Sequence, residues 1–288
     1  MQPKIIDTIL YNGEPALQLR LEMLKHVVDE FVLVEAATTF SGVPKPFLFT
    51  DQHAALLEPY RHKVTIIIVK SFPEPSDDDL RDLRSRSYIN EQSAPSWFRE
   101  QHQRDLIAPY VAERYKGQRY VILVCDADEI PNPDIVHRMR SSVDLYHALD
   151  VPTAMFMRMF YYNFSWLRFQ RWPMAFAVND HGLQAIQGKL AETRLLQMQH
   201  IDAAGWHLCY FFNAEGVARK LRSYSHTEYS GEKFTDVAMI RRCLREGCDI
   251  LNAGSDTEDE TRPFDDISSL PIELQNFQKQ IMFLQEYS

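Results

Sequence analysis

The sequence predicts an α/β protein with a largely parallel sheet, and two patterns in its 288 residues support that prediction. Short runs of β-branched residues alternate with stretches of helical periodicity, as expected of parallel strands joined by crossover helices. The run Tyr120–Cys125 is apolar throughout, which is typical of a central strand buried on both faces. No repeat or low-complexity tract divides the chain.

The first half of the chain shows this alternation most clearly. Its strands are predicted at Lys4–Tyr11, Phe31–Glu35, Val64–Val69 and Tyr120–Cys125. A helix is predicted to begin at Pro15. Apolar residues recur on one face of this helix, at Leu17, Leu21, Leu24 and Val28. A second helix is expected at Trp97–Tyr115, and the acidic, turn-rich segment Ser71–Asp79 is interpreted as a surface loop.

The second half is richer in aromatic residues. Strands are predicted at Met155–Phe164 and Trp172–Val178, and the stretch between them, which contains Trp166, is interpreted as a loop. Helices are predicted from Pro133 and at Ala214–Tyr224, Phe234–Glu246 and Pro271–Phe283. We expect residues 1–253 to form one domain, on which residues 254–288 pack as an acidic loop and a helical tail.

Composition excludes several classes of protein. With 31 basic and 40 acidic residues the net charge is −9, which argues against a nucleic-acid partner. Only 10 glycines occur, and neither a dinucleotide fingerprint nor a P-loop is present. No apolar run approaches the roughly 20 residues of a membrane span, and no signal peptide is evident. The four cysteines are sparsely placed, so reduced thiols and a cytoplasmic location are predicted, with the oligomeric state left open.

Asp126 and Asp128 follow the predicted central strand directly. Ligands of open α/β sheets bind beyond the carboxyl ends of the strands, and residues two apart in an extended chain point to the same side. Two such carboxylates can hold a divalent cation that bridges a diphosphate. An acidic turn or a helix cap before Pro133 is the alternative. A second Asp-x-Asp, at Asp77 and Asp79, is interpreted as solvated surface.

The stretch Cys125–Pro131, with the letters C-D-A-D-E-I-P, resembles a segment of glycosyltransferase family seventeen. Other segments are similar in the same order: Ile6–Thr8, Tyr11–Glu14, Leu19–Leu21, Val32–Ala36, Thr38–Gly42, Lys45–Pro46, Trp97–Gln101, Gln103–Arg104, Gly205–His207 and Lys220–Leu221. Tyr224–His226 resembles some members. The resemblance implies a GT-A-type, Rossmann-like mixed sheet flanked by helices in a single domain. It also implies a UDP-sugar donor, Mn²⁺ and inversion at the anomeric carbon. Animal members carry an N-terminal anchor that this sequence lacks, which favours a cytosolic microbial or viral relative.

The resemblance suggests ligands for Mn²⁺ (or Mg²⁺). Asp128 is the first candidate, and Asp126 contacts either the metal or the donor ribose. The third ligand is expected to be His207 or His226, because imidazole suits Mn²⁺. A lone histidine on a strand is, however, more often structural.

Four further residues are candidates for binding the donor. Glu35 ends a predicted strand before a loop, where it either meets the nucleotide or caps the loop. Arg99 and Arg104 lie on one predicted helix face and could reach the diphosphate, although a solvated face explains them equally well. Lys220, near a predicted helix end, could neutralise the leaving UDP or be a surface charge.

An inverting transfer needs a carboxylate base on the acceptor hydroxyl. Glu129, beside the metal motif, and Glu228, in the second half, are the leading candidates, ahead of Glu215 and Asp236. Aromatic residues are dense from Phe156 to Trp172 and are mostly expected to form core. Among them, Trp166 and Trp172 are favoured for a sugar contact.

The sequence therefore predicts a metal-dependent inverting glycosyltransferase. It would move a sugar, with GlcNAc favoured by the resemblance, from a UDP-sugar to a hydroxyl of a glycan acceptor. A nucleotidyltransferase or a nucleotide-sugar hydrolase is the alternative enzyme, because strand-end carboxylates and a metal serve those reactions too. A glycan-binding module without turnover is the alternative from outside the enzymes.

Overall fold

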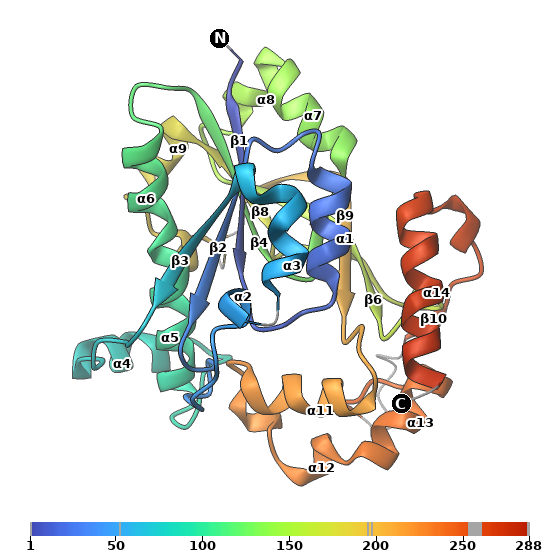
Figure 1. Ribbon diagram of the computed structural model, residues 1–288. Coiled ribbons are helices and arrows are strands. Elements are labelled where there is room, and N and C mark those ends of the chain that lie inside the picture. The colour runs from blue at the N-terminus through green and yellow to red at the C-terminus, as the bar shows by residue number, and fades with distance from the viewer. Residues whose placement is uncertain (1, 52, 195, 197, 253–260, 287–288) are drawn as a thin grey trace.

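The computed structural model describes residues 2–51, 53–194, 196, 198–252 and 261–286 (Figure 1). Its core is a sheet with the strand order β10-β7-β6-β8-β4-β1-β2-β3, and β9 pairs with both β5 and β6. The strands are β1 (Lys4–Leu10), β2 (Glu30–Ala36), β3 (Val64–Val69), β4 (Tyr120–Asp126), β5 (Glu129–Pro131), β6 (Thr153–Tyr161), β7 (Trp166–Trp172), β8 (Phe176–Asn179), β9 (Gln199–Cys209) and β10 (Arg262–Pro263).

The four strands predicted in the first half are present, and they pair in parallel as β4-β1-β2-β3. The register sets Leu10 of β1 beside Val34 of β2 on one side and Asp126 of β4 on the other. The carboxyl ends of the three strands are thus level. From β1 the chain goes to β2 on one side and later to β4 on the other, which makes this edge a topological switch point, where α/β sheets bind ligands.

Most strand pairs of the second half are antiparallel, although its longest ladder, β6 with β9, is parallel, so the expectation of a largely parallel sheet was wrong there. β8 runs antiparallel to β4 and to β6, and β6 pairs antiparallel with β7 and parallel with β9. The predicted strand Trp172–Val178 is in fact the end of β7 and the start of β8, separated at Pro173, which lacks an amide donor. The predicted loop with Trp166 is β7 itself. A mixed sheet flanked by helices in a single domain is confirmed.

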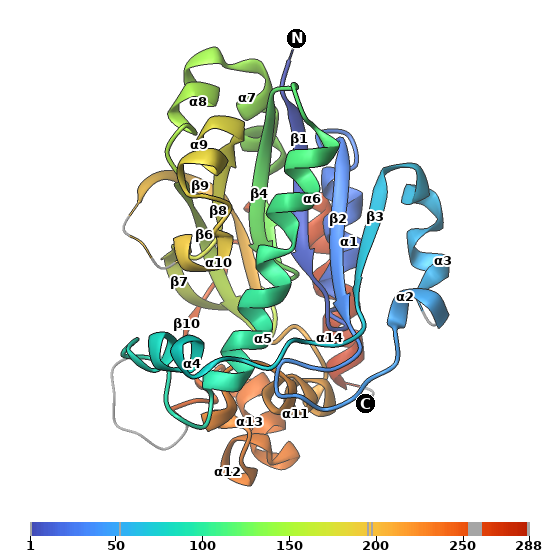
Figure 2. The same cartoon turned by 90° about the vertical axis from the view of Figure 1, so that its left-hand side faces the viewer.

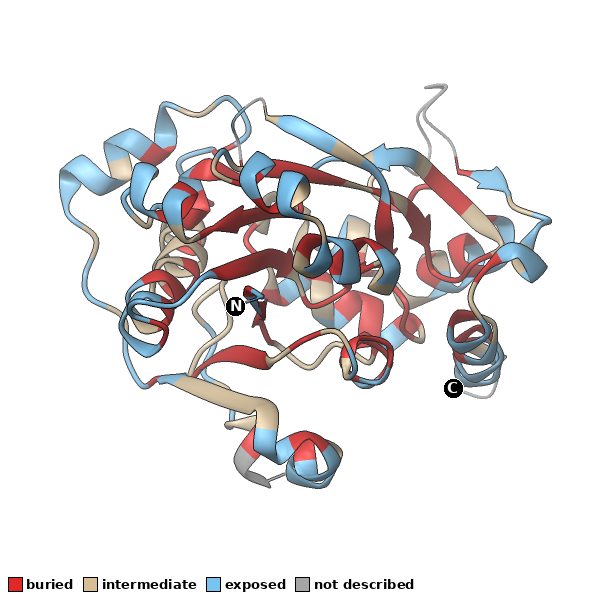
Figure 3. Cartoon of the chain, turned by 90° about the horizontal axis from the view of Figure 1, so that it is seen from above, coloured by how far each residue is buried: buried red, intermediate tan, exposed pale blue. Residues whose placement is uncertain are grey.

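Helices cover both faces of the sheet (Figure 2). On one face, α1 (Ala16–Leu24) and α7 (Pro133–Ser141) pack against alternate side chains of β1, β2 and β4. On the other face, α6 (Ile107–Arg114) and α9 (Asp180–Ala185) pack against the intervening ones. The two apolar layers bury the central strands β1, β2 and β4 almost completely (Figure 3).

The remaining elements surround this core. The short ones are α2 (Leu48–Asp51), α3 (Ala54–Leu57), α8 (Val143–Ala148), α10 (Leu190–Thr193), α12 (Glu232–Thr235) and the 3₁₀ helices Glu58–Lys63, Thr227–Tyr229 and Ile267–Ser269. The longer ones are α4 (Asp77–Arg84), α5 (Ala94–Asp105), α11 (Ala214–Ser223), α13 (Val237–Glu246) and α14 (Ile272–Glu286). Helices α11, α12 and α13 lie beyond the carboxyl ends of the parallel strands, at the bottom of Figure 1.

Two helix predictions need correction. The segment interpreted as a loop ends in α4, whose first turn is closed by a capping box between Ser76 and Asp79. Asp77 and Asp79 are exposed there, as interpreted. The single helix expected at Trp97–Tyr115 is two helices, α5 and α6. The break is explained by Pro109, which has no amide to donate to the carbonyl of Asp105 four residues earlier.

The C-terminal segment packs on the rest of the chain. β10 pairs with β7, and α14 lies against α1. Apolar side chains of both helices share one cluster, with Leu274, Phe277 and Ile281 from α14 and Ala16, Leu19 and Met23 from α1. The proposed boundary at 253 and the acidic loop that follows it fall outside the described residues. Across the described ranges, no helix has the length and apolar character needed to cross a membrane.

Candidate active site

A cavity of about 510 Å³ opens at the switch point. Its wall combines the segment after β1, helix α5, the turn between β4 and β5, the ends of β6, β7 and β9, and helix α11 with the loop that follows. Acidic and basic residues both contribute to this wall, among them Glu14, Glu100, Arg104, Asp126, Asp128, Arg194 and Lys220. Charged groups of both signs therefore surround one cavity.

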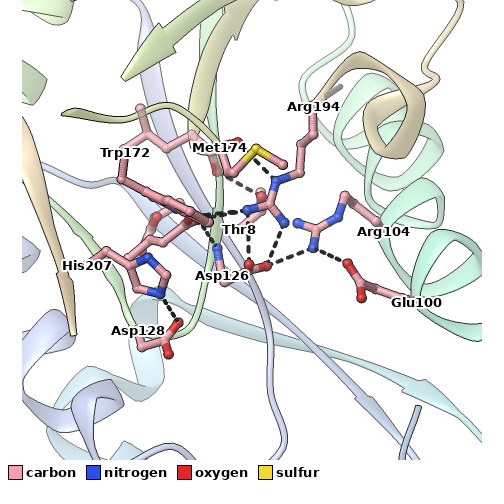
Figure 4. A network of polar contacts seen from close by, with 12 residues as sticks. Thr8, Glu100, Arg104, Asp126, Asp128, Trp172, Met174, Arg194 and His207 are labelled. Atoms are coloured by element: carbon pink, nitrogen blue, oxygen red, sulfur yellow. Dashed lines mark hydrogen bonds and ion pairs between the residues drawn. The ribbon is translucent and has the colours of Figure 1, made fainter. Parts of the chain in front are cut away.

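Asp126 ends β4 and is held by two arginines (Figure 4). Arg194 makes a bidentate pair, with Nη1 and Nη2 at 2.8 and 2.9 Å from the two carboxylate oxygens. Arg104 donates to Oδ1 at 2.7 Å and also bonds to Glu100. Burial raises the pKa of the Asp126 carboxyl, but Arg194 and Arg104 more than offset that effect and keep the pKa far below its ordinary value. Asp126 is thus a fixed anion whose charge is already paired.

Glu129, predicted as a base, is fully buried in β5. One carboxylate oxygen accepts from the indole of Trp172 at 2.7 Å, and the other accepts from the main-chain amide of Asp126 at 2.7 Å. Arg194 donates to both oxygens at 3.1 Å. With every oxygen engaged and no exposed surface, this carboxylate holds the turn in shape and is unsuited to receive a proton from an acceptor.

Asp128 lies between His207 of β9 and Lys220 of α11. The pairing of β5 with β9 brings Asp128 and His207 together. In that ladder Glu129 faces His207, and the amide of Leu208 donates to the main-chain oxygen of Asp128 at 2.8 Å. Nε2 of His207 is 3.6 Å from Oδ1 of Asp128, and Nζ of Lys220 donates to Oδ2. All three side chains line the cavity.

The charges of this trio reinforce each other. Burial raises the pKa of Asp128, but Lys220 and then His207 outweigh it and hold the pKa well below its usual range. Burial lowers the pKa of His207, and Asp128 reverses this and raises the pKa to about 10. An anion with two cationic partners thus faces the cavity.

His226 stands in another part of the cavity wall, after α11. Its Nδ1 is 2.7 Å from Oε1 of Glu228. The ring packs edge-on against Trp97 of α5 at a centroid distance of 4.9 Å, with Tyr224 and Tyr229 also in contact. His226 and the predicted base Glu228 are therefore one hydrogen-bonded pair.

Two predicted donor-binding residues lie outside the cavity wall. Glu35 is fully buried and accepts from the amides of Leu48 and Phe49 at 2.6 and 3.3 Å, so it caps the loop and helix α2, which was its alternative interpretation. Arg99 donates to the main-chain oxygens of Phe40 and Pro95. Both side chains shape the segment after β2 rather than the cavity surface.

Of the two predicted sugar contacts, Trp172 lines the cavity, next to His207 at a centroid distance of 5.1 Å. Trp166 packs on Gly247 instead. Tyr161 and Tyr210 also line the cavity, in edge-to-face contact with each other at 5.3 Å. Strands β6 and β7 and the residue after β9 thus supply one aromatic part of the wall.

Sequence reasoning missed Glu14 and Arg194. Glu14 lies in the cavity wall after β1, and burial raises the pKa of its carboxyl. It follows the carboxyl end of a strand, the same signal that identified Asp126, and that signal could have found it. Arg194 is 9% exposed and comes directly after α10. No local pattern marks it, because its carboxylate partners are 65 and 68 residues away.

The described residues offer only part of a metal site. Among them, no three His, Cys, Asp or Glu side chains gather so that they could hold a metal ion, so the predicted ligands do not form one cluster. Asp128 and His207 nevertheless bring a carboxylate oxygen and an imidazole nitrogen together at the cavity surface. Magnesium-like cations are commonly held by one or two protein ligands and completed by substrate phosphates and water. Asp128 and a neutral His207 would hold such a cation in place of the proton on the imidazole, whereas Asp126 and His226 are engaged elsewhere.

Comparison with known proteins agrees with this picture. The model of glycosyltransferase family 17 matches residues 1–260. The chain is 26% identical over 277 residues to the β-1,4-mannosyl-glycoprotein 4-β-N-acetylglucosaminyltransferases of Rattus norvegicus and Homo sapiens. These alignments cover 85% of this chain and 48% of each relative, so the chain spans about half the length of the curated relatives it matches.

A solved structure is also similar, at a much lower level. It is a mannosyltransferase from Pyrobaculum calidifontis in complex with GDP-Man and Mn²⁺, with a TM-score of 0.39 and 9% identity over 99% of this chain and 85% of that one. A likeness at this level supports no inference about this chain.

The fold is that of an α/β protein with a mixed sheet, and its cavity lies at the switch point of that sheet, between paired acidic and basic groups. With the family model covering residues 1–260, the chain belongs to glycosyltransferase family 17.

Proposed function

We propose that this chain is a metal-dependent, inverting glycosyltransferase that moves a sugar from a UDP-sugar to a hydroxyl of a glycan acceptor. The observation that carries the proposal is the trio Asp128, His207 and Lys220 in a cavity at the switch point. The names of the relatives, which describe N-acetylglucosaminyl transfer to a mannosyl glycoprotein, support GlcNAc as the sugar.

At the donor end, Asp128 and His207 would hold Mn²⁺ or Mg²⁺, which when bound acts as a Lewis acid toward the leaving diphosphate. Lys220 adds a fixed cation from α11 on the other oxygen of Asp128, placed to attract a phosphate. Arg104 and Arg194 hold Asp126 and thereby fix the wall beside the trio. Because the chain has a net charge of −9, these local cations supply the positive charge that a bound diphosphate requires.

At the acceptor end, we assign the role of the base to His226, whose ring is hydrogen-bonded to Glu228. A proton on Nδ1 that is donated to Glu228 leaves the lone pair on Nε2, as in other histidine–carboxylate pairs. His226 lines the cavity, so its free nitrogen can take the proton of an acceptor hydroxyl during a single displacement. Glu228 acts by orienting the ring, and Glu129 acts by shaping the turn.

The first test is a screen of UDP-sugars for UDP release with glycan acceptors and Mn²⁺. We expect release with a stable glycoside as product, loss of release with EDTA, and recovery when Mn²⁺ is restored. The variant Asp128→Asn is the matched control, because it removes the charge and keeps the shape. Pyrophosphate or free sugar as the product would favour the nucleotidyltransferase or the hydrolase. Glycan binding without release, unchanged in the variant, would favour the binding module.

The second test addresses the base. His226→Asn should lower kcat by about a hundredfold or more, since the group that accepts the proton of the acceptor hydroxyl is gone. Glu228→Gln should lower kcat less, because the imidazole remains. His102→Asn is the control, since His102 stacks on Phe98 and lies outside the cavity wall. A kcat in His226→Asn that stays within a few-fold of the wild-type value would remove the histidine from this role.

A further inference from the structure

A buried ion pair lies directly beneath the turn that carries Asp126 and Asp128. Arg20 of α1 and Asp7 of β1 are both fully buried. Nε and Nη2 of Arg20 donate to the two carboxylate oxygens of Asp7 at 2.8 and 2.6 Å. The guanidinium is thereby locked in one orientation, with Nη1 left to bond elsewhere.

Nη1 of Arg20 bonds to the backbone of the turn at both of its ends. It donates to the main-chain oxygen of Asp126, the last residue of β4, at 2.6 Å. It also donates to the main-chain oxygen of Glu129, the first residue of β5, at 2.7 Å. A single nitrogen therefore joins the strand before the turn to the strand after it.

Other contacts complete this hold on the turn. The Glu129 carboxylate accepts from the amide of Asp126 at 2.7 Å, and Leu208 donates to the main-chain oxygen of Asp128. The contact from Leu208 reaches the main chain of Asp128 itself, and it comes from the neighbour of His207 on β9. The position of Asp128 relative to His207 thus depends on how firmly both ends of the turn are fixed.

Stability alone does not explain an arginine at this place. Removing an ion pair from water costs several kcal/mol, and an apolar pair of similar size is often as stable or more so. A guanidinium, in contrast, has donors in a rigid fork that can serve a carboxylate and two carbonyls at once. The ammonium of a lysine is a single point with a flexible stem and cannot do so.

We propose that Arg20, oriented by Asp7, is a positioning residue that sets the Asp126–Glu129 turn so that Asp128 and His207 converge on one cation. This inference rests on the proposed function for its consequence in catalysis, whereas the hold on the turn is a property of the folded chain. The segments that contain Asp7 and Arg20, Ile6–Thr8 and Leu19–Leu21, are among those that resemble the family. The fold places both of them against another such segment, Cys125–Pro131.

The test uses Arg20→Lys, which keeps the charge and loses the fork. Hydrogen exchange measured on the peptide that contains the turn should be about tenfold faster or more, since the amide of Asp126 loses its fixed surroundings. Binding of Mn²⁺ in the presence of UDP, followed by electron paramagnetic resonance, should weaken about 10–100-fold. In the transfer assay, kcat should fall by a larger factor than the KM for an acceptor rises.

Arg140→Lys is the matched control. Arg140 also bridges a carboxylate, that of Asp29, and a main-chain oxygen, that of Val27, but at the other end of the sheet. It should leave exchange in the turn and Mn²⁺ binding unchanged. If Arg20→Lys does not fold, the neutral double variant Asp7→Asn with Arg20→Gln replaces it, because it leaves no unpaired buried charge.

Exchange in the turn at the wild-type rate, in a folded Arg20 variant, would overturn the proposal, and so would unchanged Mn²⁺ affinity with faster exchange. If the wild-type protein neither binds Mn²⁺ with UDP nor transfers a sugar, the proposed function fails. Hydrogen exchange then decides separately whether Arg20 holds the turn.

Discussion

Two aspartates that lie two residues apart are held in opposite ways. Asp126 is gripped by the guanidinium groups of Arg104 and Arg194, which are 2% and 9% exposed. Asp128 meets an ammonium and an imidazole, those of Lys220 and His207. A guanidinium fork pairs rigidly and keeps its charge, whereas an imidazole can lose its proton and bind a metal. The contacts of Asp126 therefore suit a permanent structural ion pair, whereas those of Asp128 suit a residue that exchanges its partners.

The comparison shows why an Asp-x-Asp pattern need not supply two equal ligands. Both carboxylates lie at the end of one strand, yet the packing of α5 and α10 around the first leaves only the second facing exchangeable groups. A sequence motif identifies the place, and the neighbouring elements decide which member does the chemistry. Each of the following predictions tests that division.

The largest effect is expected for activity at Asp128. Asp128→Asn should reduce kcat about 100–1000-fold, the range for removing one electrostatic group of an active site. Asp126→Asn should instead lower the free energy of unfolding by about 1–3 kcal/mol, less than for a fully buried pair because its side chain is 40% exposed. Steady-state kinetics and urea unfolding measure the two effects. A larger kcat loss at Asp126 would reverse the assignment.

A smaller effect is expected when the ion pair between Arg194 and Asp126 is weakened. Arg194→Lys keeps the charge but loses the fork that serves Asp126, Glu129 and the main-chain oxygen of Met174. The free energy of unfolding should fall by about 1–3 kcal/mol, while Mn²⁺ affinity measured by titration calorimetry should change little. The exposed Lys189→Arg is the control for stability. A large loss of Mn²⁺ affinity would show that the two aspartates are not independent.

The smallest effect concerns Glu14, and its sign depends on pH. Burial raises the pKa of this carboxyl above its ordinary value of 4.5. A raised pKa in the folded state means that its stabilising contribution is present below pH 4.5 and is lost as the pH rises through the folded value. Glu14→Gln should therefore melt at a higher temperature than wild type at neutral pH. The difference should shrink as the pH falls toward 4.5, and a difference independent of pH would contradict this explanation.

The parallel half of the fold was predicted well because local sequence patterns mark each of its strands. An unbroken apolar run marks β4, a β-branched run marks β3, and the leucines of α1 mark its buried face. The antiparallel half was harder, because Pro173 separates two strands inside one apolar, aromatic stretch. Periodicity alone does not show where such a stretch turns back.

The residues of the candidate site also differ in whether a local sequence pattern marks them. Asp126 and Asp128 could be found because they follow a buried strand. The pairing of Asp128 with His207 depends on the β5–β9 ladder, which joins segments far apart in the chain and has no local signal. The role of Arg194 is hidden for the same reason, whereas Glu35 shows that a charged residue near a strand end can also cap a neighbouring helix.

The contact between α14 and α1 has a practical consequence for producing this protein. The family match ends at residue 260, before α14 begins at Ile272. A chain shortened to that match would uncover Leu19 and Met23 on α1, and exposed apolar patches of this kind promote self-association. Because α1 also carries Arg20, the shortened chain would loosen the helix that fixes the turn. For expression and crystallisation, the chain should therefore include α14 through Glu286.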